Sequence, residues 1–123
     1  KLAEVLMSQT EAVFLIGFSA GAAACWINLA LNNLPISHCV AFYGGQIRML
    51  THLQPLYPTE LIFAEETHFS VRDLMAVLEG RINLKQSLAP FSHGFMNKLS
   101  KGYNAEAARF YWEKIKAGYE ASL

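Results

Sequence analysis

The sequence predicts an α/β fold, a doubly wound and mostly parallel sheet flanked by helices. Apolar runs of strand length alternate with segments of helical spacing, which is typical of βαβ units. Of the 123 residues, 53% are hydrophobic and 16% are charged, against roughly 25% charged in an average soluble domain. Strands buried on both faces would explain this bias. Such folds routinely need about 200 residues, so we expect residues 1–123 to form a single domain that lacks its first strands.

The first half of the chain alternates helices with buried strands. It predicts a helix over 1–9, with Leu2, Val5 and Leu6 at helical spacing, and then a strand over 12–18. A helix of small and aliphatic residues follows over 20–31 and ends at Asn32, Asn33 and Pro35. A second buried strand is predicted over 38–43, closed by Gly44 and Gly45.

The second half begins with an irregular segment over 46–59, a candidate pocket lining. A third strand over 61–64 precedes a capping box, Ser70 and Asp73, whose helix has an apolar stripe and stops at Gly80. A fourth strand is predicted over 82–88 and a loop over 90–94. The last helix is capped by Asn104, with one face formed by Ala108, Trp112, Ile115 and Tyr119.

Charge and cysteine usage exclude several classes of function. Ten Lys and Arg balance ten Asp and Glu, so we expect no binding to nucleic acid or to an anionic membrane surface. No apolar run reaches the length of about 18 residues that a membrane span needs. Cys25 and Cys39 lack CxxC spacing, which predicts buried thiols rather than a disulfide or a metal site and favours a cytoplasmic protein.

Gly17, Ser19 and Gly21 form a GxSxG motif between a buried strand and an alanine-rich helix. This is the setting of a nucleophile elbow, a sharp turn that lifts the serine hydroxyl above the carboxyl end of the sheet. The helix N-terminus would then point at the reaction centre, with the Ala20 amide as an oxyanion donor. The alternative is a tight turn in which Ser19 only caps the helix.

A serine nucleophile needs a base, which in this architecture follows an acidic residue later in the chain. Four histidines are present. We expect structural or solvated roles for His38, His52 and His68. His93 lies in "APFSHGFM", a glycine-flanked loop after the last strand, and is the candidate base.

Nearly the whole chain resembles the C-terminal half of the dienelactone hydrolase family, an α/β-hydrolase group. The resemblance is carried by "IGFSAGA", "AFYGG", "LIFAEETHF", "SHGF" and "AARFYWEKI". It implies an α/β-hydrolase fold, Ser19 as nucleophile, His93 as base, and no metal or cofactor. Many family members carry cysteine at the nucleophile position, so Ser19 is more similar to esterase-like or peptidase-like relatives.

The acid of the expected triad departs from the family pattern. The family has a segment like "GExDHF", whereas this chain reads "AEETHF", with Thr67 in place of aspartate. Three alternatives remain at this point: Glu66 acts as the acid, there is no charged acid, or another carboxylate serves. We expect Glu65 to point to the other face of the strand, and Asp73 is explained as a capping residue.

Two functional hypotheses follow. The first is a serine hydrolase of ester, thioester or lactone bonds in a small substrate, with a second oxyanion amide supplied from upstream of this chain. The second is a catalytically impaired, hydrolase-like binding module, because Thr67 replaces the acid. In either case an apolar pocket is expected, with Phe18 and Tyr43 as substrate-binding residues and further lining from Ile47, Met49, Phe69 and Phe95.

Overall fold

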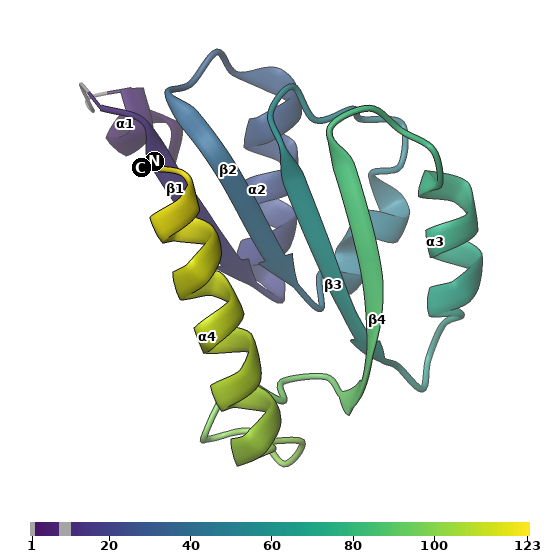
Figure 1. The fold of residues 1–123 in the computed structure, drawn as a ribbon. Coiled ribbons are helices and arrows are strands. Elements are labelled where there is room, and N and C mark those ends of the chain that lie inside the picture. The colour runs from purple at the N-terminus through teal and green to yellow at the C-terminus, as the bar shows by residue number, and fades with distance from the viewer. Residues whose placement is uncertain (1, 8–10) are drawn as a thin grey trace.

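A four-stranded sheet in which all strands run parallel forms the centre of the molecule (Figure 1). The computed structural model describes residues 2–7 and 11–123. The strands follow one another across the sheet in chain order: β1 (Val13–Phe18), β2 (Ile36–Phe42), β3 (Thr59–Glu65) and β4 (Leu84–Ser92). The carboxyl ends of all four strands therefore meet at one edge of the sheet.

Helices cover both faces of this sheet, so the predicted doubly wound α/β class is confirmed, as expected for an α/β-hydrolase-like fold. One face packs against α1 (Leu2–Met7), α2 (Ala20–Leu31), the short 3₁₀ helix η1 (Gly45–Met49) and α3 (Val71–Leu78). The other face packs against α4 (Ala105–Ala121), which lies in front of the sheet in Figure 1. Each face thus buries its own apolar cluster.

Two of the predicted helix starts are capped by side chains. Ser70 Oγ accepts a hydrogen bond from the Asp73 N–H at 3.2 Å at the start of α3. Asn104 Oδ1 accepts one from the Ala107 N–H at 3.0 Å at the start of α4. These bonds satisfy amides that have no carbonyl partner within the helix.

The fourth strand begins and ends later than predicted, at Leu84 and Ser92 instead of 82 and 88. The expected loop over 90–94 is therefore wrong for its first three residues. Pro90 lies inside the strand, which is possible because β4 is at the edge of the sheet, where a missing N–H need not break a ladder. The delayed strand end places His93 directly after it.

The buried face of α4 also differs from the prediction, since Tyr111 is buried with Ala108 and Ile115. Trp112 and Tyr119 are 46% and 47% exposed. Their rings nevertheless pack against β1. The ring centroids of Trp112 and Phe18 are 5.8 Å apart, and those of Tyr119 and Phe14 are 5.7 Å apart.

The two cysteines are buried free thiols, as predicted. Of the predicted helix over 1–9, residues 1, 8 and 9 lie outside the described residues. No helix in the described part of the chain is both long enough and apolar enough to cross a membrane.

Candidate active site

Ser19 occupies a strained turn between β1 and α2. Its φ of 54° and ψ of −117° are uncommon for a residue with a side chain, and such conformations cost about 1–3 kcal/mol. The surrounding backbone holds the turn: the Ser19 N–H donates to the Phe42 carbonyl at 2.9 Å, and the Ser19 carbonyl accepts from Ala22 at 3.0 Å. The hydroxyl makes no capping bond to α2, so it is not used in the way the helix-cap alternative requires.

The two glycines of the motif have different roles. A Cβ on Gly17 would lie 2.7 Å from Cys25 Sγ and 2.7 Å from the Gly21 carbonyl oxygen, so only glycine fits beneath the turn. A Cβ on Gly21 would meet nothing within 4 Å. Close approach between β1 and α2 therefore depends on the first glycine.

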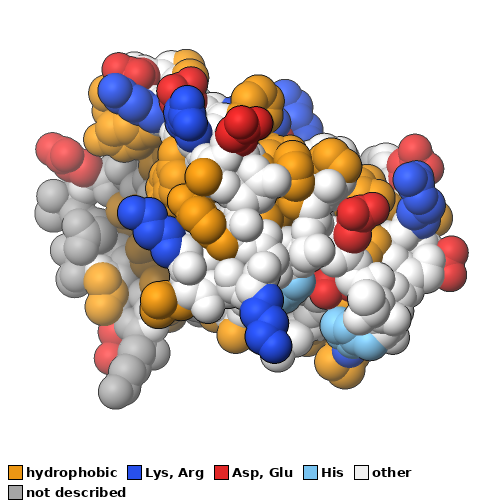
Figure 2. Space-filling model, turned by 90° about the horizontal axis from the view of Figure 1, so that it is seen from below, with side chains coloured by type: hydrophobic (Ala, Val, Ile, Leu, Met, Phe, Trp, Pro, Cys, Tyr) orange, Lys and Arg blue, Asp and Glu red, His pale blue; other side chains and the backbone are white. Residues whose placement is uncertain are grey.

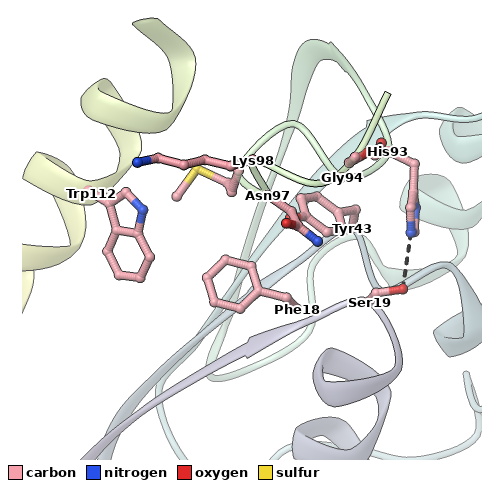
Figure 3. A pocket seen from close by; sticks show the side chains of 10 residues that line it. Phe18, Ser19, Tyr43, His93, Gly94, Asn97, Lys98 and Trp112 are labelled. Carbon is pink, nitrogen blue, oxygen red and sulfur yellow. Dashed lines mark hydrogen bonds between the residues drawn. The ribbon is translucent and has the colours of Figure 1, made fainter. Parts of the chain in front are cut away.

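His93 faces the Ser19 hydroxyl, although the two residues are 74 positions apart in the sequence. The distance from Ser19 Oγ to His93 Nε2 is 3.0 Å, the dashed contact of Figure 3. His93 directly follows β4, and a Cβ on Gly102 would lie 2.7 Å from the His93 carbonyl oxygen. The loop after β4 thus packs closely against the His93 backbone.

Glu66 is the carboxylate beside His93. The distance from His93 Nδ1 to Glu66 Oε2 is 2.7 Å, and the Glu66 side chain is 6% exposed whereas that of His93 is 43% exposed. A carboxylate only accepts hydrogen bonds, so Nδ1 carries the proton and Nε2 is left as an acceptor for the Ser19 O–H. Ser19, His93 and Glu66 are called the triad below.

Among the described residues, Glu66 and not its neighbours Glu65 and Thr67 forms the bond to His93 Nδ1. Glu65 and Thr67 are both exposed, on either side of Glu66 in the sequence. The hypothesis of an impaired binding module depended on Thr67 replacing the expected aspartate. In the structure, however, the Glu66 carboxylate lies beside His93. Asp73 caps α3, as expected.

The Ala20 amide lies at the N-terminus of α2, next to the serine. As the first residue of the helix, Ala20 has no carbonyl one turn earlier to receive its N–H. The partial positive charge of the helix N-terminus reinforces that donor. The position suits an amide that stabilises negative charge developing on a substrate oxygen.

A cavity of about 630 Å³ opens beside Ser19 and His93 (Figure 3). Phe18 and Tyr43 line it, at the positions predicted to contact substrate. The remaining lining comes from α4 and the loop after His93: Gly94, Met96, Asn97, Lys98, Ser100 and Trp112. None of these six residues was predicted from the sequence as pocket lining. The loop residues could have been predicted from their proximity to His93 in the sequence. Trp112 could not, because its position beside the cavity depends on how α4 crosses the sheet.

A second cavity of about 270 Å³ also includes Ser19 and His93. Met49 and Phe69 line this cavity, together with Arg48, Glu66 and His68. The expectation that Ile47 and Phe95 line a pocket is wrong, because both side chains are fully buried in the two apolar clusters. Their apolar character reflects core packing. In Figure 2, which views the molecule from below, histidine side chains reach the surface.

No other histidine forms a hydrogen bond with Ser19 in the described part of the chain. His38 stacks on Phe14 with ring centroids 5.3 Å apart, and burial lowers its pKa. His68 packs edge-on against Phe69 at 4.9 Å. His52 is exposed. Within residues 2–7 and 11–123, no group of three or more His, Cys, Asp or Glu side chains is arranged to hold a metal ion.

Comparison with known proteins gives two matches. The model of the dienelactone hydrolase family matches residues 1–121. The uncharacterized protein YczH of Bacillus subtilis (strain 168) is 32% identical over 115 residues, which cover 90% of this chain and 55% of that protein. The chain therefore spans about half the length of this curated relative.

Proposed function

Because the chain belongs to the dienelactone hydrolase family, we propose that it is a serine hydrolase that cleaves ester, thioester or lactone bonds in small substrates. The family match supports hydrolase chemistry of the α/β-hydrolase type. The observation that carries the finer proposal is the continuous hydrogen-bonded path from Ser19 Oγ through His93 to Glu66, with distances of 3.0 and 2.7 Å. Both distances lie within the range for hydrogen bonds, and the contact between Ser19 Oγ and His93 Nε2 is short enough for His93 to take the serine proton.

In the first half-reaction, Ser19 Oγ attacks the substrate carbonyl carbon while His93 Nε2 takes the hydroxyl proton. Glu66 stabilises the imidazolium that forms and keeps the ring in the reactive tautomer. The Ala20 amide donates to the carbonyl oxygen as it becomes negative. When the tetrahedral intermediate collapses, His93 returns the proton to the departing oxygen or sulfur, and the acyl group stays on Ser19.

Water completes the cycle in the second half-reaction. His93 takes a proton from the water as its oxygen attacks the acyl carbon, and then returns a proton to Ser19 Oγ as the acid product leaves. The aromatic walls formed by Phe18 and Tyr43 suit an apolar acyl or ring portion of a small substrate. Because an ester, a thioester and a lactone share the same acyl carbon chemistry, the triad itself does not choose among them.

Covalent labelling tests the proposed nucleophile. The intact protein should react with a fluorophosphonate probe and gain the mass of one adduct on the peptide that contains Ser19. Ser19→Ala should remove the label, while Ser122→Ala, a serine at the end of α4, should not. Absence of labelling in a folded protein would remove the basis for serine catalysis. The rates at which the protein hydrolyses a p-nitrophenyl ester, a thioester and a lactone of similar size would then rank the three substrate classes.

A further inference from the structure

Tyr43 has an unusual backbone conformation immediately after β2. Its φ is +38°, in a region that bulky side chains rarely adopt. Two glycines follow at positions 44 and 45, but neither is among the described residues with positive φ. The chain therefore places the strained conformation on an aromatic residue although a glycine is next to it. Strain of this kind persists only where the surrounding structure holds it, and it clusters at functional sites.

The Tyr43 ring lies between the base and the strand that carries the nucleophile. Tyr43 is 3% exposed. Its ring centroid is 4.8 Å from that of His93, 5.4 Å from that of Phe95 and 6.1 Å from that of Phe18. Figure 3 shows Tyr43 between Phe18 and His93. One side of the imidazole therefore packs on a buried aromatic ring.

The Tyr43 side chain is buried against the loop that follows His93, where it belongs to the same apolar cluster as Phe95 and Met96. Burial raises the pKa of Tyr43, and a hydrogen bond with the backbone of Met96 partly offsets that increase. The hydroxyl is therefore neutral under ordinary conditions. Phe95 belongs to the loop that begins at His93, so the Tyr43 ring contacts both the base and the loop that carries it.

His93 needs such support because its side chain is 43% exposed. An exposed imidazole without a packed face would sample rotamers in which Nε2 turns away from Ser19. We infer that Tyr43 is a positioning residue, whose ring holds the His93 imidazole in line with Ser19 Oγ. This inference rests on the proposed function, and it adds a second role to the substrate contact that the sequence predicted for Tyr43.

The two roles of Tyr43 predict different kinetics. A residue that only contacts substrate changes KM, whereas a residue that holds the base changes kcat and the reactivity of Ser19 toward a small probe. Tyr43→Leu should lower kcat for p-nitrophenyl acetate and the fluorophosphonate labelling rate by about 30-fold each, since small displacements of a catalytic group can cost up to about 100-fold. KM should stay within about threefold.

Two further variants at this position separate the ring from the backbone. Tyr43→Phe keeps the ring and should recover most of the labelling rate that Tyr43→Leu loses. Tyr43→Asn tolerates the positive φ but lacks the ring, so it should label as slowly as Tyr43→Leu even where it folds more stably. The matched control is Tyr119→Leu, which removes a half-exposed tyrosine that packs on Phe14 at 5.7 Å, away from the triad.

The outcomes distinguish this inference from the proposed function. If the wild-type protein does not label at Ser19, the proposed function fails. If the wild type labels and Tyr43→Leu or Tyr43→Asn labels at the same rate, the positioning role is overturned. If neither variant folds, NMR of the wild-type protein decides: ring-current shifts on the His93 protons that persist in Tyr43→Phe support the packed imidazole, and unshifted, averaged signals overturn it.

Discussion

Replacing Glu66 by glutamine keeps the size of the side chain and removes its charge. The amide would still lie against His93 Nδ1, where the distance is now 2.7 Å, but it could not balance the charge of the imidazolium. In the serine protease template the equivalent change costs about 10⁴ in kcat, or about 5 kcal/mol. His93 is 43% exposed, so water would stabilise part of the imidazolium charge. We therefore expect a loss of about 10³-fold, or about 4 kcal/mol.

The assay is steady-state hydrolysis of p-nitrophenyl acetate, with the fluorophosphonate labelling rate as an independent measure. Glu65→Gln is the matched control, because it makes the same chemical change one residue earlier, at an exposed position. Its kcat should stay within about twofold, as is usual for surface substitutions away from the chemistry. Equal activity of Glu66→Gln and wild type would refute the assignment of Glu66 as the acid, and an equal loss in Glu65→Gln would refute the argument from position.

Three other predictions concern stability and thiol reactivity. Gly17→Ala should lower the free energy of unfolding, measured by urea denaturation, by about 2 kcal/mol or more, because the new Cβ would overpack the turn. Gly21→Ala should stay within about 0.5 kcal/mol of the wild type in the same assay, since the space at that position is open. Cys25 and Cys39 should not react with Ellman's reagent in the native protein, because both are buried, at 3% and 0% exposure. The hydrogen bond between them raises the pKa of Cys39 and lowers that of Cys25, so burial is what protects Cys25. Rapid native titration would contradict this, and full reaction is expected after unfolding. Asn104→Ala should cost about 1 kcal/mol through loss of the α4 cap, and Asn104→Asp should restore most of it in the same assay.

The sequence predicted those features that depend on local patterns. The order of helices and strands follows from apolar periodicity, and α2 has the predicted bounds because Ser19 and Asn32 limit an alanine-rich segment. The candidate positions of Ser19 and His93 followed from a motif and from a loop after a strand. Parallel strands bring such loops to one edge of the sheet, which is why residues far apart in sequence meet there.

Features that depend on packing between distant elements were less predictable. Ile47 and Phe95 looked suited to a pocket, but an apolar side chain is equally suited to a core, and the layers of the fold decide between the two. Trp112 joins the cavity because α4 lies over β1. The choice among carboxylates also stayed open until the direction of each side chain at the end of β3 was known.

The acid of the triad is much more deeply buried than its base. Glu66 is 6% exposed and His93 is 43% exposed, so solvent reagents encounter the two groups very differently. Acylation of the imidazole by diethyl pyrocarbonate requires only access to a ring nitrogen, whereas carbodiimide coupling requires access to the carboxyl oxygens. The ring should therefore be open to chemical modification while its acidic partner is shielded, so that the base can be blocked in the folded chain under conditions that leave the acid unmodified.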